Sequence, residues 1–141
     1  RTLGAEQVDF EGLLSRSDFL TLHTPYNAET ANILNNETLA RIKPGCHVIN
    51  CATGGLIDEA ALAESIKAGR VAGAAIDVFS KEPPGADNPL LRLEQVICTP
   101  HLGAATTEAQ VNVAIQIAEQ MADYLTTGAV SNCRCRAASC W

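Results

Sequence analysis

Positive charge and long apolar runs are both scarce in this sequence of 141 residues. Lys and Arg number 10 against 16 Asp and Glu, which gives a formal net charge of −6, so we expect no nucleic-acid partner. The apolar runs are far too short to span a bilayer, so we expect no membrane partner either. Residues 1–6 have no apolar run behind their charge, and no signal peptide is expected. Because the sequence does not begin with Met, we expect further chain before it.

The six cysteines fall into two groups of three. Cys46, Cys51 and Cys98 lie in or beside apolar runs, which is typical of buried free thiols in a reducing compartment, so we expect a cytoplasmic protein. The other three crowd into the last nine residues and lack a fourth ligand for a tetrahedral metal site. We therefore expect no metal, and residues 132–141 are predicted to be an atypical, disordered tail.

Short apolar runs alternate with helix-like segments over residues 1–131, which is the pattern of repeated βα units. The end of a strand, entering a short helix, is predicted over 8–14. Further strands are predicted over 18–23, 47–50, 73–78 and 96–99, and further helices over 36–42, 59–68 and 108–126. Strands joined through helices run parallel, so the sequence predicts an α/β fold with a parallel sheet.

Polar residues and glycines mark the ends of the predicted helices. Asn36, Asp58 and Thr107 are the expected N-caps, because a short polar side chain can accept hydrogen bonds from the free N–H groups of the first turn. Gly69 and Gly128 are expected just beyond two carboxyl ends, where a left-handed backbone favours glycine. The last helix also has an apolar face, which belongs either to a core or to a subunit interface.

The first half of a doubly wound domain is missing from this pattern. The Gly-x-Gly-x-x-Gly fingerprint occurs nowhere, and neither does the acidic residue that follows it by about 20 positions. Residues 1–131 are therefore predicted to be the carboxyl-terminal half of a dinucleotide-binding domain, with a long carboxyl-terminal helix.

Three polar strings begin where predicted strands end: N-C-A-T-G-G-L-I-D-E at 50–59, D-V-F-S-K-E-P at 77–83 and T-P-H-L-G-A at 99–104. Ligands of open α/β sheets bind beyond the carboxyl ends of the strands, so chemistry is expected at these strings. Together the strings resemble the signatures of the D-isomer-specific 2-hydroxyacid dehydrogenases. The stretches 101–110 and 124–130 are most similar to the D-3-phosphoglycerate dehydrogenase branch of that family.

The resemblance implies a Rossmann-like domain of an NAD-dependent enzyme acting on a small-molecule 2-hydroxy acid, with homo-oligomers among full-length members. It makes His101 the catalytic base and Glu82 its partner. The chemistry agrees, because histidine titrates near working pH, and a carboxylate bonded to imidazole orients the ring and raises its pKa. The residues that would line the cofactor cleft are Thr24, Cys51, Ala52, Thr53, Asp77, His101, Leu102, Gly103 and Ala104.

Thr53 departs from the resemblance, which places an arginine at this position to grip the substrate carboxylate or carbonyl. An arginine offers a charged, bidentate fork, whereas threonine offers one hydroxyl and no charge. Losing a charged hydrogen bond costs roughly 1.5–3 kcal/mol. Losing a donor that acts in the transition state costs on the order of 10²–10³ in rate. We therefore predict impaired substrate binding and turnover.

Three interpretations of function stay open. The first is part of an NAD-dependent 2-hydroxyacid dehydrogenase, the second is a non-catalytic NAD-responsive binding module, and the third is a nonfunctional truncated product. The presence of both Glu82 and His101 favours the enzyme. Asp58 and Glu59 receive no catalytic role, because charge at a helix N-terminus explains them.

Overall fold

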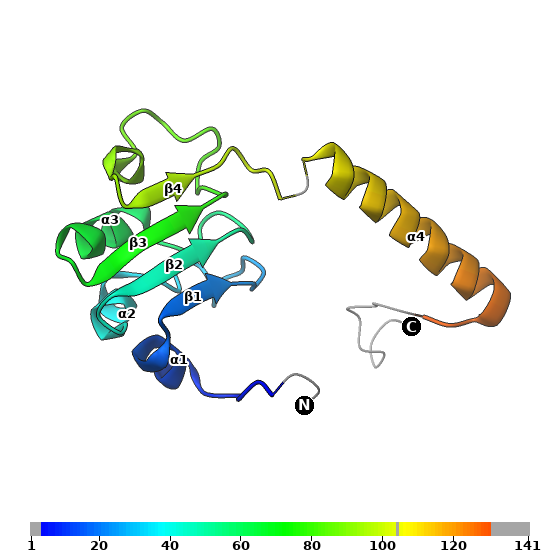
Figure 1. The fold of residues 1–141 in the computed structure, drawn as a ribbon, viewed down its shortest axis with the longest axis horizontal. Helices are drawn as coiled ribbons and strands as arrows, with labels where there is room; N and C mark the ends of the chain where they lie inside the picture. Colours follow the sequence, from blue (N-terminus) through cyan, green and yellow to red (C-terminus); the bar gives the residue numbers. More distant parts are fainter. Residues whose placement is uncertain (1–3, 104, 131–141) are drawn as a thin grey trace. The chain divides into compact units, whose positions relative to one another are not determined.

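The computed structural model describes residues 4–103 and 105–130, and the chain divides between Leu102 and Gly103 into two units. The first unit holds a four-stranded sheet with helices, and the second holds one long helix (Figure 1). The elements of the first unit are, in order, α1 (Phe10–Arg16), β1 (Phe19–Leu22), α2 (Asn36–Arg41), β2 (Cys46–Asn50), α3 (Glu59–Lys67), β3 (Val71–Ile76), the 3-10 helix η1 (Pro89–Arg92) and β4 (Val96–Cys98).

All four strands of the sheet are parallel and lie in the order β1-β2-β3-β4, so each crossover moves one position along the sheet. Their last residues, Leu22, Asn50, Ile76 and Cys98, are partners in register across the sheet. The strands therefore end at one level, and the segments that follow them share one edge. The predicted α/β fold with a parallel sheet is confirmed.

One face of the sheet carries the core of the unit. Residues such as Leu20 and Val48 are buried there, and burial of an aliphatic side chain of this size contributes about 1.5–3 kcal/mol. The helices α1, α2, α3 and η1 contact one another in that order. On the opposite face, Phe19 and Ile97 are each 68% exposed, and the Phe19 ring stacks on His47 with 5.2 Å between ring centroids.

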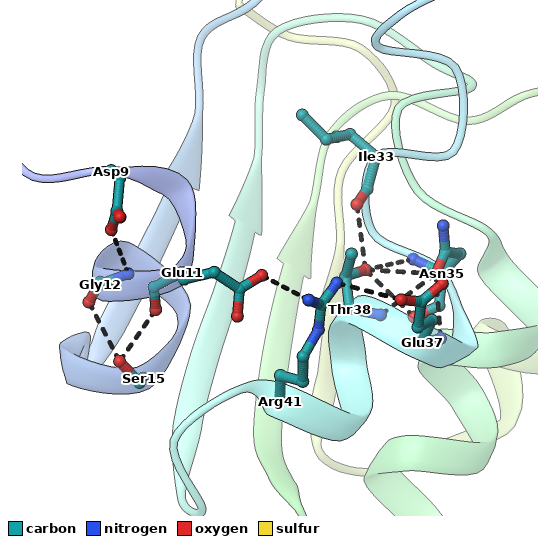
Figure 2. A network of polar contacts seen from close by, with 9 residues as sticks. All are labelled: Asp9, Glu11, Gly12, Ser15, Ile33, Asn35, Glu37, Thr38 and Arg41. Atoms are coloured by element: carbon teal, nitrogen blue, oxygen red, sulfur yellow. Dashed lines mark hydrogen bonds and ion pairs between the residues drawn. The ribbon is translucent and has the colours of Figure 1, made fainter.

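The N-cap of helix α2 lies one residue earlier than the sequence predicts. Its N-cap is Asn35, whose side chain accepts a hydrogen bond from the backbone N–H of Thr38 while the Thr38 hydroxyl accepts one from the Asn35 N–H. This reciprocal capping box decides between two adjacent asparagines, so the predicted cap at Asn36 is wrong. Figure 2 shows this cap and Arg41 of α2, which forms an ion pair with Glu11 of α1.

Other boundaries of the first unit are partly as predicted. Asp58 caps α3, and Gly69 follows that helix with a φ of +75°, so both predictions are confirmed. Residues 4–9 form no strand, and α1 begins directly after its cap Asp9, because a strand needs a neighbour with which to pair. Strand β3 begins and ends two residues earlier than its predicted range of 73–78, because Val71 already pairs with β2. Asp77 therefore follows the strand instead of lying within it.

The second unit contains α4 (Thr107–Thr127). Its N-cap is Thr106, whose hydroxyl accepts from the Ala109 N–H, so the predicted cap at Thr107 is also wrong by one residue. Gly128 ends the helix with a φ of +72°, as predicted. The large apolar side chains of α4 are all at least 51% exposed, and the described part of this unit buries none of them. Among residues 4–103 and 105–130, no helix is long and apolar enough to cross a membrane.

Candidate active site

Most of the site residues predicted from the sequence lie at the carboxyl edge of the sheet. Thr24 follows β1, Cys51 follows β2, Asp77 follows β3, and the turn with His101 follows β4. Because the four strands end in register, the segments that leave adjacent strands are neighbours at this edge. Parallel sheets of this kind bind ligands at this edge.

His101 and Glu82 meet at this edge, although they are 19 residues apart in the sequence. His101 Nδ1 lies 2.7 Å from Glu82 Oε2, and Glu82 Oε1 accepts a hydrogen bond of 3.0 Å from the Phe79 N–H. The bond with His101, together with the Phe79 N–H, lowers the pKa of Glu82. The same bond and the carboxylate charge raise the pKa of His101. With Nδ1 committed to the carboxylate, Nε2 is the ring atom suited to exchange a proton with a ligand.

Asp77 fixes the turn that carries His101. The carboxylate oxygen Oδ1 accepts hydrogen bonds from the Leu102 N–H, at 2.8 Å, and from the Thr99 hydroxyl. The carbonyl oxygen of Asp77 accepts the His101 N–H at 3.0 Å. His101 has a φ of +54°, a left-handed conformation that is unfavourable for a residue with a side chain. The contacts of Asp77 therefore hold His101 in a conformation that it would otherwise rarely adopt.

The loop after β2 packs closely against the segment that leads to Glu82. The buried Asn50 shapes this loop, because its side chain donates to the Thr53 carbonyl and accepts from the Ala52 N–H. A Cβ added to Gly54 would lie 1.9 Å from the carbonyl oxygen of Phe79, so only glycine permits this approach. Thr53, which stands where the resemblance places an arginine, is half-buried in the same loop.

The Thr24 hydroxyl is a buried polar atom just beyond β1. Its Oγ1 makes no hydrogen bond within the described part of the chain, although buried polar groups are nearly always paired. A ligand with a polar group at this edge would satisfy it. Cys51, at the neighbouring strand end, is an exposed free thiol, so the prediction that it is buried is wrong: it follows β2 into the loop instead of lying within the buried strand.

Glu59 makes two contacts at this edge that the sequence does not predict. Its Oε1 accepts from the Ser80 N–H at 2.7 Å, and its Oε2 accepts from the Asn88 side-chain amide at 2.6 Å. Charge at the start of α3 is therefore an incomplete explanation of this residue. The partners are 21 and 29 residues away, and no local pattern in the sequence indicates such contacts.

A pocket of about 430 Å³ opens beside His101 and Glu82, which we call the imidazole–carboxylate pair. Its polar lining comes from Asp77, Glu82, Thr99 and His101, and its apolar wall from Phe79, Pro83, Pro84, Leu91, Cys98 and Pro100. An apolar wall with a few converging polar groups is the usual make-up of a small-molecule site.

Two of the predicted lining residues are not placed at this edge. Gly103 belongs to the second unit, and Ala104 lies outside the described residues, as does the predicted tail 132–141. Within the described ranges, no group of three His, Cys, Asp or Glu side chains could hold a metal ion.

Residues 1–103 match the family model of the D-isomer specific 2-hydroxyacid dehydrogenase NAD-binding domain. The chain belongs to this family. It is 52% identical over 123 residues to the D-3-phosphoglycerate dehydrogenase of Synechocystis and 51% identical over 124 residues to that of Bacillus subtilis. These matches cover 87% and 88% of this chain but only 22% and 23% of the relatives, so the chain spans less than a quarter of their length.

Solved structures of the family share the fold. A glyoxylate reductase from Paecilomyes thermophila superposes with a TM-score of 0.76 at 33% identity, over 91% of this chain and 39% of the reductase. A formate dehydrogenase from Staphylococcus aureus, solved with NAD, gives a TM-score of 0.72 at 28% identity, over 89% of this chain and 38% of that one. The Rossmann-like fold expected from the resemblance is therefore confirmed, as is the family.

Proposed function

We propose that this chain is part of an NAD-dependent dehydrogenase that converts D-3-phosphoglycerate to 3-phosphohydroxypyruvate. The observation that carries the proposal is the 2.7 Å contact between His101 and Glu82 at the carboxyl edge of the sheet. About half of the matched residues are identical to those of proteins named D-3-phosphoglycerate dehydrogenase, which supports this substrate over other 2-hydroxy acids.

In this proposal His101 takes the hydroxyl proton of the substrate at Nε2. Glu82 keeps the ring in place through Nδ1 and stabilises the imidazolium that forms. Oxidation requires the neutral ring and the reverse reduction requires the charged one, so the raised pKa of His101 shifts the pH range for oxidation upward. Asp77 holds the turn in which His101 lies.

NAD would supply the hydride acceptor, and this chain fits one end of it. Thr24, whose buried hydroxyl has no partner among the described residues, would hold the nicotinamide end together with the loop Cys51, Ala52 and Thr53. This end would lie beside Asp77 and the segment from His101 to Leu102. The sequence has no glycine fingerprint to bind the pyrophosphate, so these residues would contribute only part of the affinity.

Thr53 is the weak point of the proposed site. A threonine cannot offer the charged fork that would hold a substrate carboxylate, so we propose that turnover is impaired in this chain. The same residue supports a second candidate, a non-catalytic NAD-responsive module, in which the charge is not needed.

Cys46, Cys51 and Cys98 are free thiols, which supports a cytoplasmic location. The exposed apolar side chains of α4 support assembly into homo-oligomers.

A chimera tests the proposal. Residues 4–130 of this chain would replace the matching segment of the Bacillus subtilis relative, and NADH formation from D-3-phosphoglycerate would be followed by absorbance. We expect a low rate, and Thr53→Arg should raise kcat/KM by about 10²–10³. Folding of both chimeras is checked by circular dichroism. NADH formation that stays at background in the folded Thr53→Arg chimera would reject the enzyme, and NAD binding retained without turnover would favour the module.

A further inference from the structure

The loop between β3 and η1 carries Glu82, and a single side chain outside the loop binds it near both ends. That side chain is Glu59, whose two carboxylate oxygens accept from the Ser80 N–H at 2.7 Å and from the Asn88 amide at 2.6 Å. Ser80 is exposed, whereas Glu59 and Asn88 are half-buried. Charge-assisted hydrogen bonds of this length are among the stronger ones in proteins.

Glu59 is a rigid point of attachment because it is the first residue of α3. The helix is fixed at this end by its cap Asp58, which accepts from the N–H groups of Ala60 and Ala61. Farther along α3, the side chains of Leu62 and Ile66 are buried in the core. The carboxylate therefore connects the core to a loop that forms no regular structure of its own between Asp77 and Asn88.

The contact at Ser80 leads directly to the imidazole–carboxylate pair. Ser80 follows Phe79, whose N–H donates to Glu82 Oε1, and the other oxygen of Glu82 meets His101. At the far end of the loop, the Asn88 side chain also accepts from the Leu90 N–H and so caps η1. A displacement of Ser80 would move the N–H that orients Glu82.

We propose that Glu59 is a positioning residue for the pair formed by Glu82 and His101, acting through the loop that it binds at Ser80 and Asn88. This role rests on the proposed function for the importance of the pair in catalysis. The geometric part of the proposal, that Glu59 sets the contact between Glu82 and His101, does not depend on turnover.

An isosteric change isolates this contact. In Glu59→Gln one carboxylate oxygen becomes an NH₂ group, which then faces either the Ser80 N–H or the Asn88 amide, and two donors cannot bond. Asn88→Asp alone places two carboxylates against each other. Together the two changes restore both bonds, because the new carboxylate at position 88 accepts from the new amide while its second oxygen still accepts from the Leu90 N–H.

The experiment is a pH titration of the three histidines by NMR in the full chain of 141 residues, with His101 assigned through His101→Gln. In Glu59→Gln and in Asn88→Asp, the titration midpoint of His101 should move to lower pH, because Glu82, the partner that raises the pKa of His101, is displaced. The double variant should return the midpoint toward that of the original chain. Glu64→Gln is the control, because Glu64 lies on the same helix, is exposed and forms an ion pair with the nearby Lys67.

Thermal melting of each variant separates positioning from stability. A lower melting temperature in Glu59→Gln with an unchanged His101 midpoint would overturn the proposal and leave Glu59 a structural residue. So would a double variant that stays as low as the two single ones. If Glu59→Gln fails to fold, Asn88→Asp carries the same test through the other half of the contact. A shifted midpoint together with an inactive chimera would reject the enzyme and keep the positioning role.

Discussion

Replacing Asp77 by alanine is expected to release the turn that holds His101. Asp77 is only 5% exposed, and its Oδ1 accepts from the Leu102 N–H and from the Thr99 hydroxyl. These bonds offset the left-handed conformation of His101, which costs roughly 1–2 kcal/mol. Without them, His101 should relax to a negative φ and leave Glu82.

The size of the loss follows from the two bonds. A hydrogen bond to a charged group contributes about 1.5–3 kcal/mol, so Asp77→Ala should lower the free energy of unfolding by about 3–6 kcal/mol. Thr99→Val removes one of the bonds and should cost about half as much. Asp77→Asn keeps an acceptor oxygen in place and should fall between the original chain and Asp77→Ala.

Urea unfolding followed by circular dichroism measures this series, with the free energy obtained by linear extrapolation. If Asp77→Ala leaves no stable fold in water, Thr99→Val and Asp77→Asn keep the series measurable. A loss within about 0.5 kcal/mol for Asp77→Ala, which is the range of ordinary surface substitutions, would refute the reasoning. An equal loss for Thr99→Val and Asp77→Ala would show that the Leu102 bond contributes nothing.

Three other predictions concern the same edge of the sheet. Glu82→Gln should lower the pKa of His101 and remove the stability that the pair contributes. In the original chain, the contribution of His101 is lost as pH rises through its raised pKa, and that of Glu82 is lost as pH falls through its lowered pKa. Urea unfolding at a series of pH values measures both losses. Gly54→Ala would place a Cβ against the Phe79 carbonyl oxygen, so we expect a loss of about 1–3 kcal/mol in the same unfolding assay. Thr24→Val removes a buried hydroxyl that has no partner in the part of the chain that the structure describes, so stability should stay equal or rise, whereas the KM for NAD of the chimera should increase.

The strands were predictable because short apolar runs end at proline, glycine or polar residues. The run before Thr24-Pro25 gives β1, and the run after Gly45 gives β2. The two caps missed by one residue lie in the pairs Asn35-Asn36 and Thr106-Thr107. Both members of each pair have a suitable side chain, and only the hydrogen bonds in the folded helix choose between them.

The pairing of His101 with Glu82 was predictable from motifs with known roles, but its support was not. Asp77 was expected to face the cofactor, and its bonds to the turn depend on the adjacency of β3 and β4. Glu59 was explained by its position in a helix, whereas its partners come from a distant loop. Contacts across such sequence distances follow from the assembled fold, which local patterns do not specify.

The most direct test of the central claim removes the imidazole from an active form of the site. In the Thr53→Arg chimera, His101→Gln should lower kcat for NADH formation by about 10²–10⁴, the usual contribution of a general base. The KM for NAD should change far less, because the other residues proposed to contact the cofactor remain. Equal kcat values with and without His101→Gln would contradict the assignment of this edge of the sheet as a dehydrogenase active site.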